Sequence, residues 1–161
     1  MNKIKKEYKI LILIGIILII IDQALKIYAM NNNNKEIIDG ILRITISESQ
    51  NELYEIKNNS AIIYLISNLI IIIVAFKFII SENQFIDKKT KIFLSLIIAG
   101  GISNCIDRIF RGYVIEYIDF TNILKIPIFN LADICILIGW IAIAAIFASF
   151  TAKELKERKS K

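Results

Sequence analysis

The stretch ILILIGIILIIIDQALKIYA, residues 10–29, decides the fold class of this chain. A helix that crosses a bilayer core about 30 Å thick needs about 20 mostly apolar residues, and this stretch supplies them. Its charged and amide side chains are Asp22, Gln23 and Lys26, all near its second end. The apolar run is longer than that of a cleaved signal peptide, and no small-x-small cleavage site follows it. We therefore predict a permanent membrane-spanning helix with polar groups near one end.

Three further apolar runs have the length of a membrane span. They cover residues 61–80, 92–110 and about 134–151. The chain of 161 residues is 56% hydrophobic, well above the roughly 45–50% of soluble domains, and that excess must face lipid or another chain. The sequence predicts one integral membrane domain over residues 1–161, an all-α membrane protein built as a bundle of four transmembrane helices.

The positions of the lysines and arginines predict the orientation. The net charge is +5, which could indicate a nucleic-acid partner, but the basic residues flank the apolar runs. They gather at the N-terminus, around residues 88–91 and after residue 151, whereas the loop 31–60 carries more acidic than basic residues. By the positive-inside rule, both termini are expected in the cytoplasm and the loops 31–60 and 111–132 outside. We expect no nucleic-acid binding.

The first outer loop also contains a strand pattern. Its apolar residues Leu42, Ile44 and Ile46 alternate with polar ones, which is the period of an amphipathic strand. A second short strand is predicted at residues 53–56. The sequence therefore predicts a small β element in the first extracytoplasmic loop, close to the membrane surface.

The composition excludes several kinds of chemistry. The chain has no histidine, so a Ser-His-Asp triad, a Cys-His pair and a histidine metal site are excluded. Cys105 and Cys135 both lie in apolar helical runs and are interpreted as packed thiols. We predict no metal site. Carboxylates, amides, hydroxyls, lysines and arginines remain for catalysis.

Such residues gather at one level, the outer ends of the predicted spans. They are Asp22, Lys26, Asn58, Asn104, Asp107, Arg108, Glu116, Asp119, Asn130 and Asp133. Ionisable groups inside a membrane are costly and indicate function by default, although each could also cap a helix or tie the bundle together. Two carboxylates held close together can share one proton and hydrolyse a peptide bond. Proton or cation transport also uses buried carboxylates, but the inner halves of the spans carry few polar groups.

Four motifs resemble a known family. Residues 22–26 read DQALK, residues 100–108 read GGISNCIDR, residues 111–120 read RGYVIEYIDF and residues 129–133 read FNLAD. In order and spacing they resemble the motifs Asp-Gln-x-x-Lys, Gly-Gly-x-x-Asn-x-x-Asp-Arg, Gly-x-Val-Val-Asp-Phe-Ile-Asp-Phe and Phe-Asn-x-Ala-Asp. These are the motifs of the lipoprotein signal peptidases, or type II signal peptidases, and the resemblance covers nearly the whole chain.

The resemblance implies an intramembrane aspartic endopeptidase of the bacterial inner (cytoplasmic) membrane. Such an enzyme removes the signal peptide from diacylglyceryl-modified prolipoproteins, cutting before the lipidated cysteine. It uses no cofactor, works among membrane lipids and is inhibited by globomycin-type peptides. The implied catalytic pair is Asp133 and Glu116, with Asp119 as the alternative partner of Asp133. The resemblance assigns supporting or substrate-binding roles to Asp22, Lys26, Asn58, Asn104, Asp107, Arg108 and Asn130.

The sequence departs from the family pattern at two places. Glu116 stands where the pattern has aspartate, and Ser60 stands where Asn-x-Gly-Ala-Ala-Phe has glycine. Three interpretations therefore stay open. The chain is an active peptidase with a Glu–Asp pair, a divergent relative that binds lipidated peptides without cutting them, or a small transporter or assembly protein that shares only the bundle.

Overall fold

The computed structural model describes residues 2–48, 60–81 and 86–159, and this part contains four long helices. They are α1 (Asn2–Asn31), α2 (Ser60–Ile80), α3 (Lys88–Phe110) and α4 (Leu131–Lys159). Each is long and apolar enough to cross a membrane, over Tyr8–Asn31, Ile62–Ile80, Lys88–Phe110 and Leu131–Arg158. The predicted four-helix membrane fold is confirmed, with helices that extend several residues beyond some of the predicted spans.

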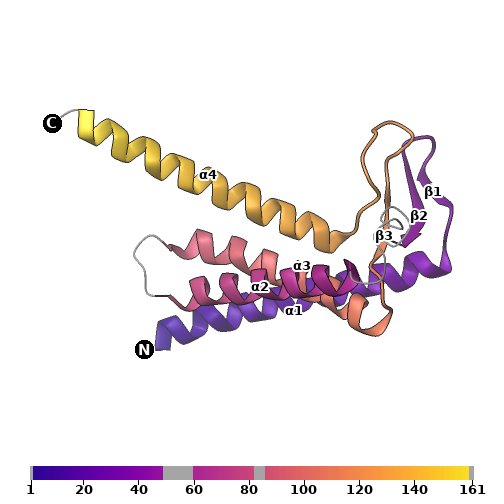
Figure 1. Cartoon of the computed structure of the whole chain (residues 1–161), viewed down its shortest axis with the longest axis horizontal. Coiled ribbons are helices and arrows are strands. Elements are labelled where there is room, and N and C mark those ends of the chain that lie inside the picture. Colours follow the sequence, from indigo (N-terminus) through magenta and orange to yellow (C-terminus); the bar gives the residue numbers. More distant parts are fainter. Residues whose placement is uncertain (1, 49–59, 82–85, 160–161) are drawn as a thin grey trace.

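Helix α3 is the central helix of the bundle and packs against α1, α2 and α4 (Figure 1). Of its most apolar stretch 56% is buried, against at most 17% for the other three helices. Close contact with α4 depends on glycine. A Cβ atom on Gly100 would lie 2.4 Å from the carbonyl oxygen of Ala132, and one on Gly139 would lie 2.8 Å from that of Phe93. These two glycines let the backbones of α3 and α4 touch.

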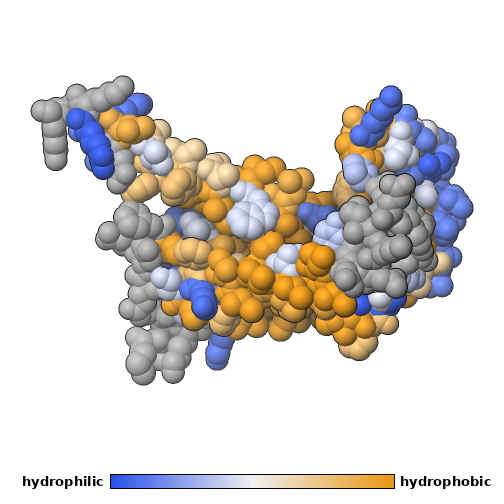
Figure 2. Space-filling view, viewed as in Figure 1, coloured by the Kyte–Doolittle hydropathy of each residue, from blue (hydrophilic) through white to orange (hydrophobic). Residues whose placement is uncertain are grey.

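The outer faces of the helices are apolar. Figure 2 shows hydrophobic residues over the helical body and hydrophilic residues at its two ends. Large side chains such as Ile12, Ile63 and Phe76 are more than half exposed, at 62%, 61% and 55%. A surface of this kind is stable in lipid, where it need not be removed from water.

A three-stranded antiparallel sheet stands at one end of the bundle (Figure 1). Its strands are β1 (Lys35–Ile38), β2 (Leu42–Glu48) and β3 (Ile115–Asp119), in the order β1-β2-β3. The predicted strand at Leu42–Ile46 is confirmed as part of β2. The strand predicted at residues 53–56 lies outside the described residues. Strands β1 and β3 were not predicted, and β3 comes from the connection between α3 and α4 rather than from the first outer loop.

The chain turns sharply between α3 and β3. Helix α3 ends at Phe110, and Gly112 follows with φ +82°, a left-handed conformation that suits glycine just after a helix. The turn brings Ile115 and Tyr117 onto the end of α1, where they pack with Ala29. The sheet is thereby fixed to the bundle, at the end opposite the two chain termini (Figure 1).

Candidate active site

The buried ammonium group of Lys26 links α1 to α3. Its Nζ atom lies 2.8 Å from Asp22 Oδ2 and 2.8 Å from Asp107 Oδ2, and donates to Asn104 Oδ1 at 3.0 Å. Lys26 is 0% exposed, and a buried charge is stable only when paired and hydrogen-bonded. The expected pairing of Asp22 with Lys26, and the shared face of Asn104 and Asp107, are both present.

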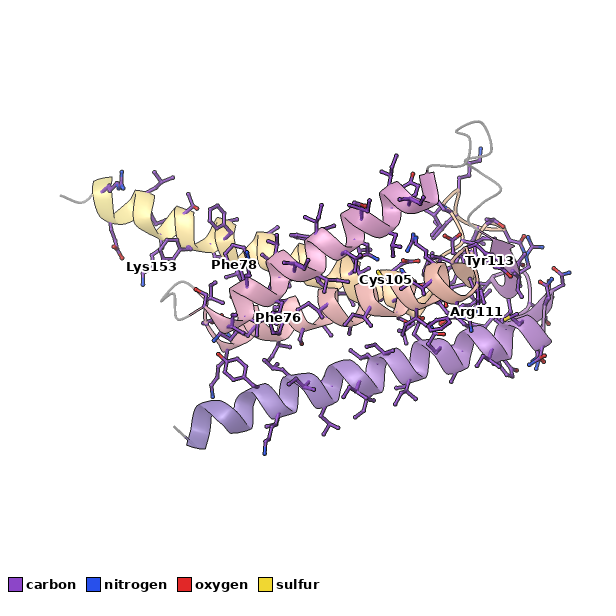
Figure 3. All side chains as sticks on the ribbon, turned by 60° about the horizontal axis from the view of Figure 1, so that its bottom comes forward. Phe76, Phe78, Cys105, Arg111, Tyr113 and Lys153 are labelled. Carbon is purple, nitrogen blue, oxygen red and sulfur yellow. The ribbon has the colours of Figure 1, made fainter. Side chains whose placement is uncertain are left out.

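Asp107 also connects α3 to the start of β3. Its carboxylate accepts hydrogen bonds from Gln23 Nε2 at 3.0 Å and from the backbone N–H of Ile115 at 3.2 Å, and it pairs with Arg111. Arg111 lies at the sheet end of the bundle, whereas Lys153 lies at the opposite end (Figure 3). Gln23 and Arg111 were not predicted from the sequence as site residues. The spacing of four between Asp107 and Arg111 was the available signal.

Asp22 connects α1 to α4. Its two carboxylate oxygens accept hydrogen bonds, one from the hydroxyl of Ser103 at 2.6 Å and the other from the backbone N–H of Ala132 at 3.1 Å. Anionic groups are favoured at a helix N-terminus, where the first N–H groups have no partner inside the helix. Ser103 is a third site residue that was not predicted from the sequence, and it is a polar residue in a buried part of α3.

Asp133 lies in the first turn of α4 and is held by two asparagines. Asn104 Nδ2 donates to Asp133 Oδ1 at 2.7 Å, and the backbone N–H of Asn130 donates to Asp133 Oδ2 at 3.1 Å. The Asn130 side chain caps the helix and also donates to Asn104 Oδ1 at 3.2 Å. Asn130 is therefore both a cap and a member of the polar cluster. Asp133 remains half-buried, unlike Asp22 and Asp107.

Glu116 lies in β3 next to the start of α4. The carbonyl oxygen of Ile115 accepts a hydrogen bond from Asn130 Nδ2 at 3.2 Å, and Ile118 forms a bridge with Phe129. Glu116 lies between these two contacts, so its backbone runs beside the residues that lead into α4. Burial alternates along β3, and the Glu116 side chain is on the half-exposed face.

Asp119 lies on the buried face of β3 and is 1% exposed. Its carboxylate accepts hydrogen bonds from Arg43 Nε at 2.5 Å, from the Thr121 backbone N–H at 2.8 Å and from the Thr121 hydroxyl at 2.6 Å. Burial by itself raises the pKa of Asp119, but the hydrogen bonds from Thr121 and Arg43 outweigh it and hold that pKa well below its usual value.

Two predicted residues remain. Arg108 is half-buried on α3 and donates to the carbonyl oxygen of Asn104 in its own helix at 3.3 Å. Asn58 lies outside the described residues. Within the described part of the chain, no group of three or more carboxylates and thiols is arranged to hold a metal ion.

The arrangement matches a known family along most of its length. The family model of signal peptidase (SPase) II matches residues 14–149. The chain belongs to this family. The lipoprotein signal peptidase of Staphylococcus aureus strain JH9 is 34% identical over 156 residues, covering 92% of this chain and 94% of the relative. The protein of strain Newman matches with the same identity and coverage.

Two solved structures of bacterial membrane enzymes show the same fold. A bacterial membrane enzyme determined by the in meso method at 2.3 Å resolution superposes with a TM-score of 0.76 at 30% identity, covering 90% of this chain and 91% of that one. A second, at 1.9 Å resolution, gives a TM-score of 0.75, also at 30% identity, covering 86% of this chain and 92% of that one. The predictions of an aspartic-type signal peptidase and of a multi-pass membrane protein are confirmed.

Proposed function

We propose that this member of the signal peptidase II family cleaves diacylglyceryl-modified prolipoproteins before the lipidated cysteine, with Asp133 and Glu116 as its catalytic carboxylates. The observation that supports this choice is how the carboxylates of the site are partnered. Asp22 and Asp107 are fully buried and both pair with Lys26. Because Lys26 neutralises their negative charge, we propose that these two carboxylates position the helices around the site and do not take part in proton transfer.

Asp133 differs from these two carboxylates. Among the described contacts, its oxygens accept hydrogen bonds from an amide side chain and a backbone N–H, and neither donor is charged. It is half-buried in the first turn of α4, and α4 begins at the end of the bundle where the sheet stands (Figure 1). A carboxylate held by neutral donors, with part of its surface accessible, can take up and release a proton during catalysis.

The choice of Glu116 over Asp119 rests on their contacts and on the strand. The Asp119 carboxylate is held by Arg43 and Thr121 on the buried face of β3. Glu116 is on the other, half-exposed face, and its strand runs beside the entry to α4. We therefore propose Glu116 as the partner of Asp133 and a structural role for Asp119.

The proposed reaction needs only these two side chains and water. The two carboxylates share one proton. The ionised one takes a proton from water as the water oxygen attacks the peptide carbonyl carbon, while the protonated one donates to the carbonyl oxygen. When the C–N bond breaks, the nitrogen takes a proton from the carboxyl group that accepted one from water and leaves as an amine. At the same time a hydroxyl of the tetrahedral intermediate returns its proton to the other carboxylate, so a carboxylic acid remains on the signal peptide and the pair again holds one proton. Asn104 and Asn130 hold Asp133 in position throughout.

A cleavage assay tests this proposal. Purified protein in liposomes is mixed with a synthetic diacylated prolipopeptide, and the products are identified by mass spectrometry. We expect cleavage before the lipidated cysteine by the wild type, and a loss of at least about a hundredfold in Asp133→Asn, which keeps the shape but cannot carry the proton. A near-normal rate in Asp133→Asn would remove this residue from the mechanism. Binding without cleavage by the wild type would favour the non-cleaving alternative, and ion flux through the liposomes would favour a transporter.

The proposed location is the bacterial cytoplasmic membrane, with both chain termini inside. In support, α1 begins and α4 ends at the same end of the bundle, opposite the sheet (Figure 1). A cysteine introduced at Asn32, a half-exposed position between α1 and β1, should react with an impermeant thiol reagent in intact cells. Labelling at Lys159→Cys but not at Asn32→Cys would contradict this orientation.

The proposed partners are lipidated prolipoprotein signal peptides, membrane lipid and globomycin-type cyclic peptides. The inhibitors place a hydroxyl between the two catalytic carboxylates of the family. Because Glu116 is one methylene longer than aspartate, we expect such inhibitors to bind more weakly here. Displacement of a labelled globomycin analogue would measure this, and binding as tight as that of a family member with two aspartates would show that the glutamate preserves the spacing.

A further inference from the structure

The N–H groups of the first turn of α4 are held by groups from three parts of the chain. The N–H of Leu131 donates to the Tyr117 hydroxyl at 3.3 Å, that of Ala132 to Asp22 Oδ1 at 3.1 Å and that of Asp133 to Asn130 Oδ1 at 2.8 Å. The first N–H groups of a helix have no acceptor within the helix, so each contact fixes where the helix starts. The position of Asp133 therefore depends on β3, α1 and the cap residue together.

Tyr117 is the β3 side chain in this arrangement. Tyr117 is 5% exposed and packs with Ala29, Ile44 and Ile115. Its hydroxyl is also close enough to the Asp22 carboxylate to feel its charge. Burial and the nearby negative charge of Asp22 raise the pKa of Tyr117, so the hydroxyl keeps its proton. A protonated phenol oxygen can still accept a hydrogen bond, and here it accepts one from the backbone N–H of Leu131.

From these contacts we infer that Tyr117 is a positioning residue whose hydroxyl sets the spacing between Glu116 on β3 and Asp133 on α4. This inference rests on the proposed function. Glu116 is the neighbour of Tyr117 in the strand, and Asp133 lies two residues after Leu131. A shift of β3 against α4 would therefore move one carboxylate relative to the other.

The sequence indicates that the spacing between β3 and α4 is matched to a glutamate at position 116, which is longer than the aspartate of the family motif. The family motif has aspartate followed by phenylalanine where this chain has Glu116 followed by Tyr117. Phenylalanine cannot accept the Leu131 N–H, so the contact that fixes β3 to α4 and the extra methylene occur together. We infer that the tyrosine holds the strand at the distance that suits a glutamate.

Kinetics of four proteins test the inference: the wild type, Tyr117→Phe, Glu116→Asp and the double variant. In the wild-type background we expect Tyr117→Phe to lower kcat about tenfold or more while KM stays unchanged, because a misplacement of about 1 Å can cost about a hundredfold in rate. In the Glu116→Asp background we expect the same change to raise kcat, since a strand released from α4 can move to suit the shorter acid. This reversal of sign is a readout that a purely structural role would not give.

Tyr8→Phe is the matched control. It removes a hydroxyl that donates to the carbonyl oxygen of Ile79 at 3.4 Å, where α2 ends and far along the chain from the site. We expect its kcat to equal that of the wild type. If Tyr117→Phe lowers kcat by the same factor in both backgrounds, or leaves kcat unchanged, the inference is wrong.

Hydrogen exchange gives a measurement that does not depend on activity. Tyr117→Phe should speed amide exchange in a peptide that covers the start of α4, and Tyr8→Phe should not. Unchanged exchange in Tyr117→Phe would overturn the positioning contact. A wild type that fails to cleave would overturn the proposed function instead. The exchange measurement would then still show whether the contact between Tyr117 and Leu131 holds the start of α4.

Discussion

Asn130 and Asp133 cap each other at the start of α4. The backbone N–H of Asn130 donates to Asp133 Oδ2 at 3.1 Å, and the backbone N–H of Asp133 donates to Asn130 Oδ1 at 2.8 Å. A reciprocal cap of this kind normally only stabilises a helix terminus. Here it also fixes the side chain of a proposed catalytic carboxylate, so helix stability and site geometry depend on the same two residues.

Removal of this cap should lower the cleavage rate by more than the accompanying loss of folding stability accounts for. We expect Asn130→Ala to cost about 0.5–2 kcal/mol of stability, as for other cap residues, and also to lower kcat about tenfold or more by freeing Asp133. Asp87→Ala is the matched control, because Asp87 caps α3 by accepting the Thr90 N–H at 2.8 Å. Thermal unfolding and cleavage rates of both variants would be compared. Equal loss of activity in the two would show that capping alone is responsible.

Lys26 should be essential for folding because it neutralises two buried carboxylates. Lys26→Met leaves Asp22 and Asp107 without this partner and should cost about 3–5 kcal/mol. The double variant Lys26→Met/Asp22→Asn should recover part of the loss. Lys35→Met is the control, since Lys35 is exposed and should change stability by less than about 0.5 kcal/mol. Unfolding in detergent measures all three, and a Lys26→Met protein as stable as the Lys35→Met protein would contradict the assignment.

A side chain at Gly100 should separate α3 from α4. The Cβ atom of Gly100→Ala would meet the carbonyl oxygen of Ala132 at 2.4 Å, a backbone atom that cannot rotate away. We expect a cost of about 1–3 kcal/mol and a drop in cleavage rate, because Ala132 adjoins Asp133. Gly15→Ala is the control, since its nearest neighbour would be the Ala99 Cβ at 3.9 Å. If the two variants melt at the same temperature, the close approach of the backbones is not important for stability.

Asp119 should contribute stability that depends on pH. Because its pKa in the folded protein is lowered from 3.8, its contribution is present above that value and is lost as the pH falls towards the folded-state pKa. Asp119→Asn should therefore be less stable than the wild type at neutral pH, and the difference should shrink at about pH 3. Thermal unfolding at the two pH values measures it. A difference that is the same at both would show that the carboxylate charge does not stabilise the sheet.

The helices and the polar cluster could be predicted because their signals are local. Spans of about 20 apolar residues are visible in the sequence, and spacings of three or four place Asp22 with Lys26 and Asn104 with Asp107 on shared faces. Strand β3 was missed because its partner β2 lies about 70 residues earlier in the chain, and local sequence does not show that pairing. The hydrogen bonds of Gln23 to Ser103 and of Leu131 to Tyr117 depend on how the elements pack. For the same reason, residue types alone could not separate Glu116 from Asp119.

The most direct test of the account compares Glu116→Gln with Asp119→Asn in the cleavage assay. Both variants replace a carboxylate by an amide of equal length, and both should remain folded at neutral pH by thermal unfolding. We predict that Glu116→Gln loses at least about a hundredfold in rate, because it cannot carry the shared proton, whereas Asp119→Asn keeps most of its activity. Normal cleavage by Glu116→Gln together with a folded but inactive Asp119→Asn would make Asp119 the partner of Asp133 and would contradict the account.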